Sequence, residues 1–511
     1  MISADILDVS RKVKNRFLQE NLKERIAMTS SKSQKNRGYY IHCIVFIILT
    51  FAIGFLPPFG QITPLGMKVL GCFIGVIYGW IFVGFIWPSL FGMIALGIVG
   101  YDSIINVFGA ALGNSTVVQT FFTFIFVATL DASGLTKFIA EWCVSRKICK
   151  GRPWILTALF FIASFFVAGC INLYGGIIIL WSIFYNICKL VGFKKGDPYV
   201  SYMVAGIVFV GTISIISLPF LPLSIIYYGL LVEAAVGYAM PSLALTIDGL
   251  LIVIVSTLLY LFVGKYVLKI NVEPLKNAES ILSEFRNVKI TQEQVLSIIS
   301  LIFFMVIALL PSFLPDSNLK AFLSNYGILG AATTVIIIQC LRRDKDGKSI
   351  YNFGDLVQRG VNWDIVIMFA ASMPLSASLE SNDTGIVATL VDVLMPFLSQ
   401  LSPAFFVIAC CIIFWLITQV AHNLILVIVF MPILATIATS FGINPYLFAI
   451  LFCMTTNCAF MTPGASAQAA MLFGNSNWIG VKDSYKLSTI FAILAIIAII
   501  CVGLPVGLLI V

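Results

Sequence analysis

The chain has 511 residues, of which 60% are hydrophobic and only 11% are charged, with a net charge of +8. Its mean hydropathy of +1.03 excludes a soluble globular protein and indicates a membrane protein with many spans. The positive charge lies mostly between the apolar stretches, where orientation in the membrane explains it, so no nucleic-acid partner is expected.

The apolar stretches predict helical spans. They are far longer than about 10 residues and show no alternation of period two, which excludes a β-barrel. The twelve cysteines lie almost all inside these stretches, without a CxxC pair or a histidine cluster. We interpret them as small apolar side chains and expect neither disulfides nor metal ligands among them.

The first part of the chain begins with a basic segment, residues 1–38, which carries nine Lys and Arg. We place this segment in the cytoplasm, either as an amphipathic helix on an anionic leaflet or as a solvated tail. The first half of the membrane domain, 39–264, follows it. The basic connector within that half, 135–152, also indicates the cytoplasmic side. Spans are expected at 39–56, 66–84, 86–101, 114–131 and 243–264.

Two stretches of this half are interrupted. The apolar stretch 153–191 has basic residues at both ends and a polar, glycine-containing middle at Gly169–Gly176. It is long enough to cross twice, but the middle suits a re-entrant hairpin open to the cytoplasm, with Asn172 at its tip. Residues 198–235 are expected to form one crossing, broken between Gly211 and Pro222.

A charged stretch, 265–291, is predicted to be a cytoplasmic linker to the second half, 292–511. The stretch 403–440 resembles the first hairpin but has no Lys or Arg at either end, so we expect it to enter from outside. Other spans of this half are expected at 292–310, 322–340, 363–383, 444–479 (broken) and 487–511.

The sequence thus predicts an all-α polytopic membrane protein with about 11 transmembrane helices plus two re-entrant hairpins in two inverted repeats. The N-terminus would be cytoplasmic and the C-terminus outside the cell (inner) membrane.

An internal repeat supports this plan. Asn172 and Asn423 are 251 residues apart, and the same offset relates Trp181 to Pro432. Repeats of polytopic membrane proteins usually place a binding site where the two halves meet. The two asparagines are therefore interpreted as landmarks of one site. The same offset relates two further pairs, Gly134 with Gly385 and Phe209 with Phe460.

Residues 40–511 resemble the divalent-anion:sodium symporter family, the dicarboxylate and citrate carriers of the ion transporter superfamily. Four stretches carry the resemblance: Asn362–Glu380, Phe121–Gly134, the two asparagine tips, and Asn457–Gly474. The resemblance implies a homodimer, a carboxylate substrate and sodium bound near the tips. The family's Ser-Asn-Thr tips read Ile171-Asn172-Leu173 and His422-Asn423-Leu424 here, so of these residues only the asparagines carry over.

Asn172 and Asn423 are predicted to hydrogen-bond a small anionic substrate, helped by backbone N–H groups at half-helix ends near the midplane. Each further candidate could instead be a polar group of helix packing. The further candidates for substrate binding are Tyr174, Thr212, Thr462, Ser466 and Gln468.

The coupling ion, Na⁺ or H⁺, is predicted to involve Asn172, Asn423 and His422, with no other cofactor and no certain metal site. His422 stands where the family has a serine, and as a buried imidazole it could carry a proton. It could also remain neutral and hydrogen-bond a tip carbonyl.

The leading hypothesis is a secondary active transporter of a small organic anion, di- or tricarboxylate-like, which works by alternating access and is cation-coupled or an exchanger. Two alternatives stay open: a carrier of a non-carboxylate solute, and a degenerate, non-transporting membrane sensor or scaffold. An enzyme is not expected, because the sequence contains no HExxH or GxSxG motif.

Overall fold

The computed structural model describes residues 38–144, 151–231, 237–277, 289–344, 346–386, 388–389, 392–393 and 402–511. Throughout these residues the regular structure is helical, apart from one isolated bridge between Arg343 and Ser349. The prediction of an all-α polytopic fold is confirmed. The basic segment 1–38 lies almost entirely outside the described residues, as does the middle of the predicted linker 265–291.

The first half opens with the helix Gly38–Phe55. It continues with α2 (Pro64–Phe82), α3 (Ile86–Ile98), α4 (Ile104–Leu112), α5 (Ser115–Ala132), α6 (Leu135–Val144), α7 (Pro153–Ser164), the π-helical turn η3 (Phe165–Gly169), α8 (Leu173–Val191), α9 (Pro198–Ser214), α10 (Pro222–Gly229) and α11 (Ser242–Phe262), which runs on through η4 (Val263–Val267).

The second half follows the same order of elements. It contains α13 (Gln292–Leu309), α14 (Asn318–Leu341), α15 (Phe353–Gly360), α16 (Trp363–Glu380), α18 (Pro403–Ile417), α19 (Asn423–Ser440), α20 (Pro445–Asn457), α21 (Ala467–Gly474), α22 (Val481–Ala498), η8 (Ile499–Gly503) and α23 (Leu504–Ile510).

Among the described residues, nine helices are long and apolar enough to cross a membrane, or ten if the pair α15–α16, bent by 79°, counts as one span. The prediction was about 11. One expected span, 86–101, is shorter in the structure: α3 has 13 residues and ends at Ile98. Gly100 then adopts a φ of +86°, which suits glycine, and Ser103 caps the separate 9-residue α4, where no span was expected.

The repeat is visible in the structure. α5 corresponds to α16, the pair α7–α8 to α18–α19, and the broken pair α9–α10 to α20–α21. Gly134 and Gly385, 251 residues apart, both have positive φ, at +74° and +65°. The rings of Phe209 and Phe460 lie 5.0 Å apart between centroids. Because these two residues are also 251 apart, contact between them places them where the two repeats meet.

Both interrupted stretches fold as helical hairpins. In α7–α8 the rings of Phe160 and Phe184 are 5.7 Å apart. In α18–α19, Phe414 meets Phe430 at 4.8 Å near the tip, and Phe406 meets Phe441 at 5.1 Å near the open end. These paired contacts show that the chain reverses direction at each tip. Entry of the two hairpins from opposite membrane faces remains a prediction.

That prediction is testable by cysteine labelling. We expect a cysteine at Arg152 or Lys195, the ends of the first hairpin, to react only with a membrane-permeant thiol reagent. A cysteine at Ser402 or Gly442, the ends of the second, should react with an impermeant reagent from outside. The unsubstituted chain gives the background from its native thiols. Labelling of the Arg152 and Lys195 positions from opposite sides would mean two crossings and would exclude the re-entrant hairpin.

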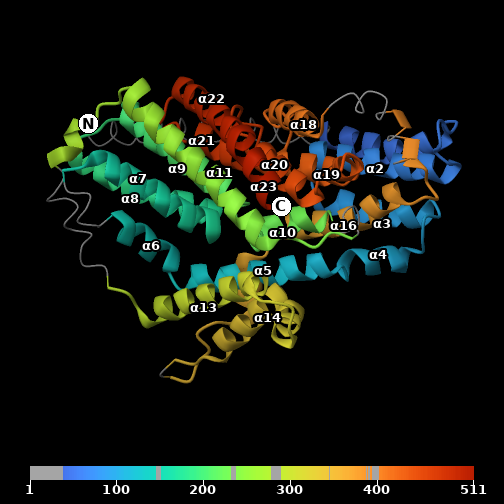
Figure 1. The fold of residues 1–511 in the computed structure, drawn as a ribbon, viewed down its shortest axis with the longest axis horizontal. Coiled ribbons are helices and arrows are strands. Elements are labelled where there is room, and N and C mark those ends of the chain that lie inside the picture. The colour runs from blue at the N-terminus through green and yellow to red at the C-terminus, as the bar shows by residue number, and fades with distance from the viewer. Residues whose placement is uncertain are drawn as a thin grey trace, which may run out of the picture.

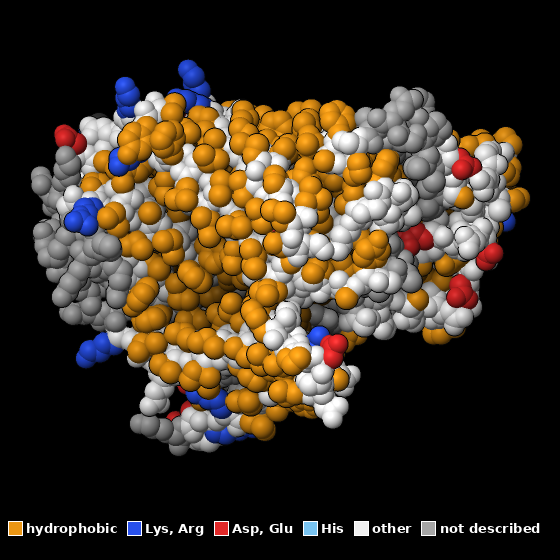
Figure 2. Space-filling view, viewed as in Figure 1, with side chains coloured by type: hydrophobic (Ala, Val, Ile, Leu, Met, Phe, Trp, Pro, Cys, Tyr) orange, Lys and Arg blue, Asp and Glu red, His pale blue; other side chains and the backbone are white. Residues whose placement is uncertain are grey.

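The helices form two groups (Figure 1). On one side α7, α8, α9, α11 and α22 run alongside one another, with α9 packed on the first hairpin and α22 packed on both α9 and α11. On the other side α2, α3 and α16 pack together, and α5 connects this region to α10 and α14. Figure 2 shows apolar side chains over the centre of this face and charged ones mostly at its periphery, as a lipid-facing surface requires.

Candidate functional site

The tip of the first hairpin is tied to the end of α5. Asn172 caps α8 by accepting a hydrogen bond from the Gly175 N–H at 2.9 Å. Its Nδ2 donates to Oδ2 of Asp131 at 2.9 Å, and the other carboxylate oxygen accepts from Thr136 at 2.7 Å. The chain bends here, at Gly134, from α5 into α6. A carboxylate therefore stands beside the first tip.

The tip of the second hairpin is held by Gln419, which is buried. Its Nε2 donates to the carbonyls of Trp415 at 2.8 Å and Cys458 at 2.9 Å. Its Oε1 accepts from the N–H groups of Phe460 at 3.2 Å and Met461 at 3.0 Å. These partners, apart from Trp415, lie in the break between α20 and α21. Gln419 thus replaces backbone hydrogen bonds that the broken helix lacks.

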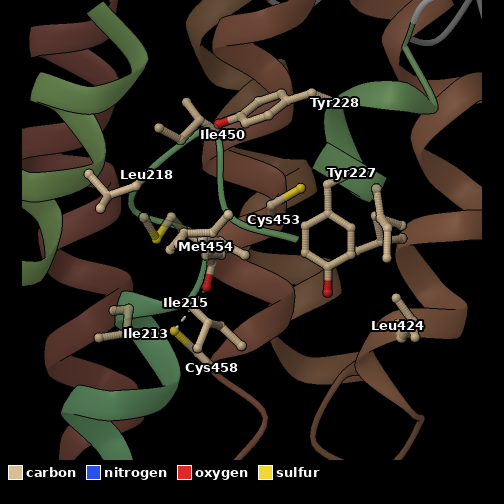
Figure 3. Packing of buried hydrophobic residues seen from close by; sticks show 14 of the residues in the cluster. Ile213, Ile215, Leu218, Tyr227, Tyr228, Leu424, Ile450, Cys453, Met454 and Cys458 are labelled. Carbon is tan, nitrogen blue, oxygen red and sulfur yellow. Dashed lines mark hydrogen bonds between the residues drawn. The ribbon is translucent and has the colours of Figure 1, made fainter. Parts of the chain in front are cut away.

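Asn423 connects this tip to both repeats. It is 5% exposed, and its Nδ2 donates to Oδ1 of Asn457, the last residue of α20, at 3.2 Å. Asn457 in turn donates to the Tyr227 hydroxyl on α10, at 3.2 Å. Figure 3 shows Tyr227 standing between Met454 of α20 and Leu424 of α19. Tyr174, two residues after Asn172 at the first tip, is 42% exposed.

Tyr227, Asn457 and Asn423 therefore form a chain of polar side chains that links α10, in the first repeat, to the second tip. The sequence alone did not indicate Asp131, Tyr227, Asn457 or Gln419 as contacts of the site. The one available signal was that each is a polar residue in an apolar stretch.

The other predicted site residues are placed as follows. Thr462 donates to the Gln419 carbonyl at 2.5 Å and so belongs to the second tip. Ser466 caps α21 by accepting from the Ala469 N–H at 3.1 Å, and donates to the Ala459 carbonyl. Gln468 is buried in the first turn of α21. Thr212 is buried in α9, where its hydroxyl donates to the Val208 carbonyl of its own helix at 2.8 Å.

His422 is the residue before Asn423, at the start of α19. Its ring lies 5.7 Å from that of Phe85, at the turn between α2 and α3. Its Nδ1 is buried without a hydrogen-bond partner in the described part of the chain. The imidazole therefore lies between the second hairpin and the α2–α3 turn, and a hydrogen bond from Nδ1 to a tip carbonyl is not formed.

The charges around the tips are few. The segments 165–176, 417–424 and 457–468 contain no Lys, Arg, Asp or Glu, so Asp131 is the carboxylate that the structure places in contact with a tip. The first turns of α8 and α19 contribute backbone N–H groups and the positive end of the helix dipole. This arrangement can bind an anion through N–H groups, provided that Asp131 is neutralised.

Comparison with known proteins identifies the family. The sequence profile of the citrate transporter family matches residues 73–453. The uncharacterized transporter YfbS of Escherichia coli (strain K12) is 28% identical over 173 residues, which are 33% of this chain and 27% of YfbS. The sodium-dependent dicarboxylate transporter SdcS of Staphylococcus saprophyticus is 25% identical over 146 residues, 29% of this chain and 27% of SdcS. The matched region thus spans about a quarter of the length of these relatives.

Among solved structures, the YdaH transporter of Alcanivorax borkumensis has the same fold with a TM-score of 0.56 and 12% identity, over 78% of this chain and 86% of YdaH. The family profile covers well over half of the chain and confirms the resemblance that the tips and the broken-helix segment indicated. The chain belongs to the citrate transporter family.

Proposed function

We propose that this protein is a secondary active transporter of a small organic anion, di- or tricarboxylate-like, and that it works by alternating access. The observation that carries the proposal is the polar chain from Tyr227 of α10 through Asn457 to Asn423, which joins the broken helix of the first repeat to the tip of the second hairpin. A site shared by two repeats can open to either side when one repeat moves against the other.

The substrate would bind between the tips. The free N–H groups at the start of α8 and α19 suit carboxylate oxygens, and the side-chain amides of Asn172 and Asn423 can turn from Asp131 and Asn457 toward the ligand. Because the tip segments contain no Lys or Arg, binding would depend on these neutral donors and on the helix dipoles.

Asp131 supports coupling to a cation. An ionised carboxylate in contact with Asn172 would repel an anionic substrate strongly in a site of low dielectric. A bound Na⁺ or a proton on Asp131 removes this repulsion, so substrate and cation would bind together. The second tip fits a cation less well, because the carbonyls of Cys458 and Gln419 already accept from Gln419 and Thr462.

Ligand binding tests the proposal directly. Purified protein in detergent is expected to show a higher melting temperature with dicarboxylates or citrate than with sulfate or amino acids, because ligand bound to the native state stabilises it. Sodium and pH are varied in parallel to identify the cation. A shift with amino acids alone would favour the non-carboxylate carrier, and no shift with any solute would favour the non-transporting sensor or scaffold.

The role of His422 is tested by the pH dependence of uptake. We predict that transport does not require sodium and varies with pH between about 5 and 8, where an imidazole titrates. His422→Gln keeps a hydrogen-bonding side chain that cannot titrate, and is expected to flatten the profile of uptake into liposomes. His42→Gln, at the other histidine of the chain, is the matched control. Uptake that requires sodium and keeps its pH profile in His422→Gln would contradict the proton hypothesis.

Three further features belong to this proposal. They are the division into halves at 39–264 and 292–511, a homodimer, and an N-terminus in the cytoplasm with the C-terminus outside.

A further inference from the structure

A second ionisable group lies inside the protein, away from the tips. Asp248, in the second turn of α11, is 0% exposed. Neither of its carboxylate oxygens has a hydrogen-bond partner among the described residues. An ionised carboxylate without a partner in the membrane interior is very costly, so such residues usually have a function.

The neighbours of Asp248 leave it space but provide few ligands. Its Oδ2 lies 3.3 Å from where a Cβ on Gly507 of α23 would stand. The Cδ1 atom of Leu447 on α20 lies closer still to that position, so Leu447 and Asp248 share the space that the missing side chain of Gly507 leaves. Tyr446, the residue before Leu447 on α20, has its ring 6.5 Å from that of Tyr228 on α10. A sodium or divalent ion would need several more oxygen ligands than this, whereas a proton needs one.

Among the described residues, no basic side chain is found on most of the helices around Asp248. The described helices α7, α9, α10, α11, α20 and α23 contain no Lys or Arg. Two other helices that pack against α11 carry acids, and both acids have partners. Glu293 of α13 is paired with Arg342, and Asp483 of α22 accepts a hydrogen bond from Ser201. α11 and α22–α23 run antiparallel, since Tyr260 meets Phe491 while Asp248 meets Gly507. The charged residues near the C-terminal end of α11, away from Asp248, are Lys265, Lys482, Asp483 and Lys486. The titratable groups near Tyr228 are Cys453 and Tyr446.

Tyr228 lines a cavity of about 270 Å³, and so does Ser242, the first residue of α11. The cavity lies between α5, α10, α11, α13, α14 and α20, and part of its wall is polar, which allows it to hold water. Figure 3 shows the Tyr228 hydroxyl directed toward Ile450, whereas its neighbour Tyr227 points toward the level of Leu424. The polar residues of the wall are Thr116, Gln119, Tyr228, Ser242 and Tyr446.

We propose that Asp248 is a proton-binding site that exchanges its proton with water in this cavity past the side chain of Tyr228. In the step itself, hydronium gives its proton to a carboxylate oxygen of Asp248 and leaves water, and the reverse step returns it. The Tyr228 hydroxyl can accept one hydrogen bond and donate another, so it can pass the proton along without a net change.

The position of Tyr228 connects the proton site to the tips. Tyr227, the preceding residue of α10, accepts the hydrogen bond from Asn457 that leads to Asn423. A shift of α10 on substrate binding would therefore move both tyrosines. This last step rests on the proposed transport function, whereas proton binding by Asp248 does not.

Infrared difference spectroscopy of the purified full chain tests the proposal. Spectra between about pH 4 and about pH 10 are expected to contain the band of a protonated carboxyl group that titrates and shifts in ²H₂O. Asp248→Asn should remove this band, and Asp248→Glu should move it. Tyr228→Phe should keep the band but slow its hydrogen exchange by about tenfold. Asp316→Asn, at an exposed carboxylate paired with Lys320, is the control and should keep it.

Three results would overturn the proposal: a band that persists unchanged in Asp248→Asn, a carboxyl band of Asp248 that neither titrates nor exchanges, or loss of the band on adding sodium at constant pH. If Asp248→Asn does not fold, the Asp248→Glu variant decides: a carboxyl band that moves supports the proposal, and one that stays in place contradicts it. Failure of uptake by the wild type would contradict the transport function and leave the infrared result standing, so the two proposals fail separately.

Discussion

The double variant Asn172→Ala/Asn423→Ala is expected to abolish uptake of the anion while the protein remains folded. Each side chain would lose its hydrogen bond to a desolvated ligand, at a cost on the order of 1–3 kcal/mol, or about tenfold to a hundredfold in affinity. The two losses together would lower affinity by about a hundredfold to ten-thousandfold if they add. Uptake into liposomes and ligand-induced thermal shifts of the single and double variants measure this.

The control must account for helix capping, because Asn172 also caps α8. Asn114 caps α5 by accepting from the Thr116 N–H at 2.9 Å, outside the tips. Asn114→Ala should lose about 1 kcal/mol of stability, as Asn172→Ala does, but should retain ligand affinity. If either single tip variant transports like the wild type, that asparagine serves packing and not substrate.

Gln419→Ala is expected to cause the largest loss of stability among single changes at the tips. The substitution leaves the Cys458 carbonyl and the N–H groups of Phe460 and Met461 without their side-chain partner inside the protein. Each unsatisfied buried group costs about 1–3 kcal/mol, so three such groups cost about 3–9 kcal/mol if the costs add. The measurement is the melting temperature of the purified protein in detergent.

Two comparisons sharpen this test. Gln419→Glu keeps an oxygen that can accept from Phe460 and Met461, so it should destabilise less than the alanine variant. Gln61→Ala removes an amide that bonds Asp392 at the exposed surface and should change the melting temperature little. Equal melting temperatures for Gln419→Ala and Gln61→Ala would show that the tip does not depend on this side chain.

The helical plan follows closely from the sequence. The predicted hairpins 153–191 and 403–440 coincide with α7–α8 and α18–α19. Their ends are set by local chemistry: Pro153 and Pro403 each start a helix, and Ser402 caps α18. Hydrophobic length and proline or serine positions are local signals, so one sequence suffices to locate these elements.

The partners of the tip residues could not be predicted in the same way. Asn457 and Tyr227 are 230 residues apart, and Gln419 lies 39 residues from Cys458. A hydropathy pattern shows that a polar residue interrupts an apolar stretch, but not which other segment it faces. For the same reason the sequence did not indicate that His422 packs against Phe85, at the turn between α2 and α3.

Asp248 illustrates a different limit. In the sequence it is one acid within an apolar helix, and a cap, an ion pair or a water-facing position would all fit that pattern. Only the packing of α11 against α23 and α20 shows that both of its oxygens are enclosed without a partner. The absence of a partner is a property of three helices together, which the sequence of one helix does not contain.

The central claim is that the two hairpin tips form one anion site of a cation-coupled transporter. Uptake of labelled dicarboxylate or citrate into liposomes containing the purified protein tests it most directly, with sodium and pH gradients imposed separately. The account predicts saturable uptake that one of these gradients drives and that the Asn172→Ala/Asn423→Ala variant lacks. Uptake no greater than in protein-free liposomes, for every anion and under both gradients, would contradict it.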